Sequence, residues 1–171
     1  MKRLIVLTSA TLLLFLAACD SKFIDDIFTF NVEKSFELRI PAGTPAGRLP
    51  IPLTVPLLID SATLAKENTT VNLLKSAKLT KLQIVNFVPS TFSLSNIDTL
   101  DFRIESNNQP LTSLAYYSSG MDTIRLTLAD FAPHLKDAGA KITADAAINT
   151  ATTEEVVATV NYTITFSAHP F

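Results

Sequence analysis

The chain has 171 residues and a formal net charge of −2, because 14 Lys and Arg are set against 16 Asp and Glu. This mildly acidic balance gives no electrostatic basis for binding nucleic acid, which requires a surplus of basic side chains. The single cysteine excludes a disulfide framework and a metal site built from paired cysteines. The length fits one domain with a substantial core.

Residues 1–18 have the form of a secretory signal. Lys2 and Arg3 precede an apolar run over 4–16, which is too short for a membrane-spanning helix of about 20 residues. The run ends in Leu16-Ala17-Ala18-Cys19, which resembles the lipobox of bacterial lipoproteins. The resemblance implies cleavage before Cys19, a thioether-linked diacylglycerol on its sulfur and usually an acylated amine, so that several chains anchor the protein. Two alternatives stay open: an ordinary signal peptide with a free Cys19, and a buried N-terminal helix.

Cleavage before Cys19 changes the composition of the exported chain. It removes Lys2 and Arg3, so the net charge moves from −2 to −4. The next residue, Asp20, resembles an inner-membrane retention signal of enterobacteria. In Bacteroidota, acidic residues shortly after the cysteine instead resemble a surface-export signal. We expect a lipid-anchored envelope protein, at the outer membrane (periplasmic face or cell surface) in preference to the inner membrane.

The mature chain is expected to consist of a lipidated tether over 19–34 and one domain over 35–171. Residues 20–30 mix acidic with aromatic and aliphatic side chains, which suits either a first strand or docked segment, or insertion into the membrane interface. The alternation of Phe36, Leu38 and Ile40 predicts a half-buried strand, followed by a loop rich in Pro and Gly. Three prolines within 50–57 then allow only an edge strand or an extended segment.

Residues 61–76 are the one helical candidate beyond the signal. Ser61 would cap it, and Thr69-Thr70 limits it to one or two short turns. Alternating apolar residues next predict strands over 77–88, 97–105, 111–117 and 122–129. A helical turn is expected at 130–136, and two further strands are expected over 141–149 and 155–168.

A series of alternating strands with almost no helix determines the expected fold class. Alternation means that one face of each strand is covered, which is typical of antiparallel sheets. A parallel sheet would need crossover helices for which the chain has no room. We therefore predict an all-β fold, an antiparallel β-sandwich of Ig-like or jelly-roll topology with one or two short helical turns. A closed eight-stranded barrel is the alternative.

Motifs for chemistry are missing from the sequence. It has no nucleophile elbow, glycine-rich phosphate loop, paired-histidine zinc motif or calcium loop, and we expect no catalytic residue, cofactor or metal. His134 is spaced so that Asp130 and Asp137 could join it around a metal. The simpler interpretation makes Asp130 the cap of the turn and His134 a solvated polar residue. His169 lies near the C-terminus, where fraying is expected.

Carboxylate pairs are the remaining candidates for catalysis. A glycosidase needs two carboxylates across a cleft, and the sequence cannot show that geometry. Strand ends and turns are in any case rich in Asp and Glu. The pairs are Asp25-Asp26, Asp98 with Asp101, and Glu154-Glu155.

Two further sets of residues are candidate sites. Tyr116 and Tyr117 would send one ring into the core and one outward, where it is either a ligand contact or a plain surface tyrosine. Ser61, Thr99 and Thr123 each follow an Asp and precede a small or aliphatic residue, which resembles the O-glycosylation motif of Bacteroidota. The same dipeptides are also ordinary turn and strand-start chemistry.

The order of features along the chain resembles that of uncharacterised β-sandwich lipoproteins of Bacteroidota. It rests on the lipobox, the acidic-aromatic linker, the Pro-rich segment, the strand over 76–84 and the final alternating strand. This resemblance implies no activity. We expect a non-enzymatic structural, adhesive or accessory subunit whose partners are the membrane, through Cys19, and an envelope protein or glycan.

Two other functions are weighed beside that one. A ligand- or glycan-binding module would have a concave pocket with an outward tyrosine, and an envelope hydrolase would have two facing carboxylates. A structural subunit would instead expose a long apolar sheet face or loop edge.

Overall fold

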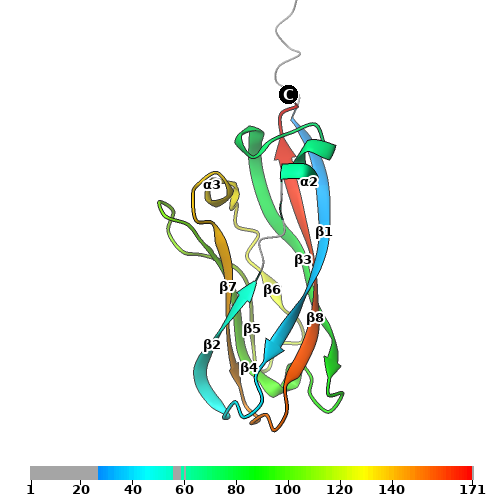
Figure 1. Cartoon of the computed structure of the whole chain (residues 1–171), viewed down its shortest axis with the longest axis vertical. Helices are drawn as coiled ribbons and strands as arrows, with labels where there is room; N and C mark the ends of the chain where they lie inside the picture. Colours follow the sequence, from blue (N-terminus) through cyan, green and yellow to red (C-terminus); the bar gives the residue numbers. More distant parts are fainter. Residues whose placement is uncertain (1–26, 56–58, 60, 171) are drawn as a thin grey trace, which may run out of the picture.

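The structure is a computed structural model that describes residues 27–55, 59 and 61–170. Two antiparallel sheets pack face to face, one with the strand order β1-β8-β3 and the other with the order β2-β7-β4-β5-β6 (Figure 1). The predicted all-β antiparallel sandwich is therefore confirmed. The strands form two separate sheets and not the closed barrel that was the alternative.

The three-stranded sheet consists of β1 (Phe28–Ile40), β8 (Val156–Ala168) and β3 (Leu74–Val88). Strand β8 lies in the middle and pairs with β1 over its whole length, from Phe28 opposite Ala168 to Ile40 opposite Val156. Its apolar residues alternate as the sequence predicted, because every second side chain enters the core.

Strand β1 begins earlier than the sequence suggested. The expected tether over 19–34 overlaps β1, because residues 28–34 already pair with β8. The ring of Phe30 stacks on Phe166 with centroids 5.2 Å apart, and Phe28 stacks on Phe30 at 5.6 Å. These two aromatic residues therefore belong to a first strand, and the domain starts before residue 35.

The five-stranded sheet contains β2 (Gly47–Val55), β7 (Lys141–Ile148), β4 (Ile97–Glu105), β5 (Thr112–Ser118) and β6 (Arg125–Leu126). Strand β2 carries the prolines and lies at the edge, as predicted, because proline cannot donate to a ladder on both sides. Strand β6 is much shorter than the 122–129 strand expected. Leu128, near its end, has a φ of +55°, which is incompatible with extended backbone.

In the part of the chain that the structure describes, helical structure is limited to short pieces. The one or two short turns expected within 61–76 are α2 (Ser61–Lys66) and a 3-10 turn (Val71–Leu73), and β3 then begins at Leu74. The turn expected at 130–136 is α3 (Ala132–Leu135), and a second 3-10 turn covers Leu94–Asn96. Within the described residues, no helix is long and apolar enough to cross a membrane.

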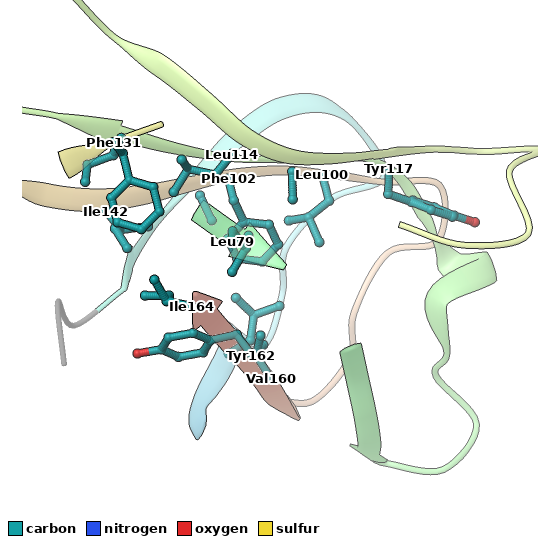
Figure 2. Packing of buried hydrophobic residues seen from close by; sticks show 14 of the residues in the cluster. Leu79, Leu100, Phe102, Leu114, Tyr117, Phe131, Ile142, Val160, Tyr162 and Ile164 are labelled. Carbon is teal, nitrogen blue, oxygen red and sulfur yellow. The ribbon is translucent and has the colours of Figure 1, made fainter. Parts of the chain in front are cut away.

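The core lies between the two sheets (Figure 2). Phe102 and Ile142 of the five-stranded sheet face Leu79, Val160 and Ile164 of the three-stranded sheet. Tyr162 belongs to the same layer, and burial raises its pKa to about 12 because the phenolate is disfavoured away from water.

The strand order favours the jelly-roll alternative over the Ig-like one. The first and last strands are neighbours in one sheet, and successive strands β1 to β4 alternate between the sheets. An even jelly roll would place four strands in each sheet. Here β6 pairs with β5, so the sheets have three and five strands, and β3 is left as an edge.

Candidate functional site

An open groove of about 430 Å³ lies at the edge of the sandwich beside β3. Residues 80–85 of β3 form one wall, and Ile124 and Leu126 form the other, next to β6. Leu94 closes one side, and Asp122 and Thr123 add polar atoms. The groove exists because β6 is short and pairs with β5 instead of β3. Solvent therefore has access to core-directed side chains of β3.

One backbone edge of β3 forms hydrogen bonds at Ala77 and is unpaired by any described strand beyond that residue. The N–H of Ala77 donates to the carboxylate of Asp130 at 2.9 Å, and the N–H of Phe131 donates to the carbonyl of Ala77 at 2.9 Å. Successive residues of a strand direct their backbone N–H and C=O groups to opposite edges. The residues of β3 that pair with even-numbered residues of β8 therefore share the edge at which Ala77 is bonded: Ala77, Leu79, Leu82 and Ile84. Beyond Ala77, no described strand pairs with this edge.

Strand β3 is the most basic strand of the described part of the chain. Lys75, Lys78 and Lys81 are exposed, and none forms an ion pair with a described residue. The strand contains no acidic residue. The free edge therefore carries unneutralised positive charge in a chain that is acidic overall.

The two tyrosines are placed as the sequence predicted, one inward and one outward. Tyr117 is 6% exposed and packs in the core, whereas Tyr116 is 38% exposed. In the register of the sheet, Tyr116 lies between Asp101 of β4 and Arg125 of β6. Neither tyrosine lines the groove beside β3, and Tyr116 lies on the exposed face of its sheet.

The candidate carboxylates are occupied by structural partners. Arg103 donates to Asp101 at 2.7 Å and lies 3.0 Å from Asp145, and the hydrogen bond to Asp101 raises the pKa of Arg103. Asp98 accepts from the hydroxyl of Ser119 at 2.7 Å.

The pair Glu154-Glu155 is exposed and directly precedes β8. Glu155 pairs with Arg39 at 3.1 Å on the exposed surface. The pair Asp25-Asp26 lies outside the described residues. The carboxylates of Asp98, Asp101 and Glu155 therefore bind partners in the sheet and its turns.

His134 differs from its expected role. Its side chain is 2% exposed, with Nδ1 3.2 Å from the hydroxyl of Ser106 and Nε2 3.0 Å from that of Thr112. Burial lowers the pKa of His134, against a smaller opposing effect of Asp137. The prediction of a solvated histidine was wrong, because α3 turns this side chain toward the β4–β5 loop.

Asp130 and Asp137, the two aspartates near His134 in the sequence, bind different partners. Asp130 accepts from the N–H of Ala132, the first residue of α3, at 3.0 Å, but the N-cap position that the sequence assigned to it is occupied by Phe131. Asp137 accepts from the backbone and side chain of Asn108, which lowers its pKa. The described residues contain no group of three or more His, Cys, Asp or Glu that could hold a metal.

His169 is held more firmly than its position suggested. Its N–H donates to the carbonyl of Leu73 at 3.1 Å, and its carbonyl accepts from the hydroxyl of Thr69 at 3.0 Å. The expected fraying does not extend to this backbone.

The candidate modification sites lie on different surfaces. Ser61 is the first residue of α2, Thr99 lies on β4 and Thr123 lies in the groove; all three are exposed. Cys19, the expected lipidation site, lies outside the described residues.

The groove itself was missed in the sequence analysis. Its one sequence signal is the set of three lysines within 75–81, because lysine is frequent on edge strands. Comparison of the chain with protein-family models, with curated proteins and with solved structures found no match.

Proposed function

We propose that this protein is a lipid-anchored, non-enzymatic subunit of the cell envelope that binds a partner through the groove between β3 and β6. The observation that carries the proposal is the open strand edge beside an apolar groove of about 430 Å³. Exposed apolar surface next to unpaired backbone groups is typical of interaction sites.

The anchor and the groove are compatible in space. Strand β1 starts at Phe28, opposite Ala168, at the end of the sandwich where α2 lies (Figure 1). A lipid on Cys19 would hold that end toward the membrane. The groove lies further along β3, over residues 80–85, and would stay accessible from the aqueous side.

The outer face of the three-stranded sheet contributes less to this proposal than the sequence suggested. A structural subunit was expected to expose a long apolar sheet face or a loop edge. The outward side chains of β1 and β8 are almost all polar: Asn31, Glu33, Ser35, Glu37, Arg39, Thr159, Asn161, Thr163, Thr165 and Ser167. The groove is therefore the better interaction surface.

A glycan-binding module is the second candidate function. Its support is the row in which Tyr116 lies between Asp101 and Arg125, because an exposed ring beside polar side chains suits a sugar. Titration of the purified chain with envelope oligosaccharides tests it, with Tyr116→Ala expected to abolish any binding. Equal binding by that variant would contradict it.

An envelope hydrolase receives no such support. Asp101 accepts a hydrogen bond from Arg103, and Asp145 forms an ion pair with the same side chain, so both carboxylates already have structural partners.

Site-specific photocrosslinking in intact cells tests the proposed function. A photoreactive residue at Gln83 or Thr123, which both line the groove, is expected to capture one shared partner. The matched control is Ala151, which is exposed in the β7–β8 loop. The same adducts from Ala151, or none from the groove, would contradict the proposal.

The anchor needs its own experiment. Metabolic labelling with a palmitate analogue is expected to mark the exported chain, and Cys19→Ser is expected to abolish both the label and membrane retention. A labelled or fully retained Cys19→Ser protein would show that another feature holds the chain at the membrane.

O-glycosylation at Ser61, Thr99 and Thr123 also remains a proposal, supported by the exposure of all three side chains. The intact mass of the exported protein is expected to exceed that of lipidated polypeptide alone. Replacement of each acceptor by Ala or Val should lower the mass by one glycan.

A further inference from the structure

We propose that the partner contributes an extended strand that pairs with the free edge of β3, and that this strand alternates apolar with acidic side chains. The inference rests on the proposed function and names the chemistry of the partner. It follows from three properties of β3: its backbone edge, the groove beneath that edge, and its lysines.

The backbone edge defines where a strand can be added. Leu79, Leu82 and Ile84 direct their outward N–H and C=O groups away from β8, and no described strand receives them. Asp130 and Phe131 close the same edge at Ala77. An incoming strand would therefore start beyond Ala77, which limits its register.

The topology shows why the position is open. Strand β6 lies beside β3 but is hydrogen-bonded to β5, so the three-stranded sheet lacks the fourth strand of an even jelly roll (Figure 1). A partner strand would supply that fourth strand. Addition of a strand to an exposed sheet edge is a general mode of peptide recognition, in which main-chain hydrogen bonds give affinity.

The groove determines one face of the added strand. Leu82 and Ile84 of β3 line it from one side, and Ile124 and Leu126 from the other. A strand paired with β3 would direct every second side chain into this space. Those side chains must be apolar, because the walls that they would meet are mainly apolar.

The lysines determine the other face. Lys78 and Lys81 lie on the outer face of the sheet, opposite to Leu79 and Leu82, because the register shifts between Leu79 and Lys81; Lys81 also lines the rim of the groove. Side chains of the added strand on that face would be their cross-strand neighbours, and opposite charges stabilise such pairs. Acidic residues are therefore preferred at these positions.

The same lysines argue against pairing between two copies of β3. Antiparallel self-pairing centred on Leu79 and Thr80 would place Lys78 opposite Lys81, and like charges directly opposite each other are destabilising. Edge lysines are a common means of preventing this kind of association.

Peptide binding to the purified full chain in detergent tests the inference. The probe is a labelled, end-capped peptide that alternates valine with glutamate; matched peptides replace glutamate by lysine or scramble the order. Fluorescence anisotropy is expected to show binding of the glutamate peptide alone. The affinity should fall as salt is raised.

Charge variants make the test specific. Lys78→Glu combined with Lys81→Glu is expected to weaken binding of the glutamate peptide about tenfold and to create binding of the lysine peptide. Lys66→Glu on α2 reverses one exposed charge away from β3 and should change neither result. All three positions are exposed, so circular dichroism should show intact folds.

Hydrogen exchange locates the bound peptide. The amides of Leu79, Leu82 and Ile84 are expected to exchange more slowly in the complex, whereas amides bonded to β8 keep their rates. Equal binding of the lysine peptide, or binding without protection of these three amides, would overturn the inference. So would a dimer, detected by sedimentation, in which β3 is protected without peptide.

These results are separable from those of the proposed function. If Thr123 forms crosslinks in cells but the peptide does not slow amide exchange in β3, the proposed partner stands and strand addition is excluded. Protection by the peptide, without groove-specific crosslinks, would contradict the proposed function and leave β3 as a strand-binding edge.

Discussion

The carboxylate of Asp130 accepts a hydrogen bond from the buried N–H of Ala77 at 2.9 Å, across the free edge of β3. The same oxygen accepts from the N–H of Ala132 at 3.0 Å. One side chain thus satisfies the first N–H of α3 and a backbone donor of β3 that no described strand pairs. The open part of the edge begins where this contact ends.

Asp130→Ala is expected to lower the free energy of unfolding by about 2 kcal/mol. The substitution leaves the N–H of Ala132 and the buried N–H of Ala77 without their side-chain acceptor. Urea denaturation measures the change. Asp130→Asn keeps an acceptor oxygen and should cost less; equal losses in both variants would contradict the hydrogen-bond explanation.

Stability should depend on the protonation of His134. Its pKa is lowered in the folded state, so the unfolded state binds a proton more readily. The contribution of the neutral ring is complete above the ordinary pKa of 6.5 and is lost as the pH falls below it toward the folded value. We therefore expect the free energy of unfolding to decrease from pH 7 to pH 5.

The variant His134→Asn isolates this effect. It should be less stable at pH 7, because Ser106 and Thr112 lose ring partners, but its stability should change less between pH 7 and pH 5. Asp137, whose pKa is lowered, loses its contribution only when the pH falls below its ordinary value of 3.8. Parallel pH profiles for the variant and the natural chain would exclude His134 as the source.

Most strands could be predicted from alternation, because alternate burial leaves a period of two in the sequence. Strand β4 has the predicted bounds, and β8 differs by one residue at its start. The short helical turns before Leu74 were predicted, but the start of β3 was not, because Leu64 of α2 and Leu74 of β3 are buried in the same core by different elements. Spacing alone does not reveal that change of element.

The site was less predictable, because it arises from pairing between distant segments. Nothing local to Arg125 and Leu126 shows that β6 will bond to β5 and leave β3 free. His134 is similar, because its burial depends on the loop that carries Ser106. The in-and-out placement of Tyr116 and Tyr117, by contrast, needs only the geometry of one strand.

The core between the sheets should be sensitive to the loss of an aromatic ring. Phe102 is 2% exposed and packs among residues of both sheets, so Phe102→Ala is expected to cost about 3–5 kcal/mol. Leu111→Ala, at a side chain that is 54% exposed, should change stability by no more than about 0.5 kcal/mol. Thermal and urea unfolding compare the two. Similar losses would mean that Phe102 is not part of a close-packed core.

A bulky group at Thr123 should block the groove. Because Cys19 is the only cysteine of the chain, Thr123→Cys in a Cys19→Ser background gives a single thiol that can be alkylated with a polymer. We expect the alkylated protein to lose binding of the glutamate peptide, since Thr123 lines the groove beside β3. Thr99→Cys in the same background, alkylated in the same way, places the polymer on exposed β4 and should keep binding. Retained binding with polymer on Cys at position 123 would mean that the peptide pairs elsewhere, because a strand along residues 80–85 and a polymer at that site would occupy the same space.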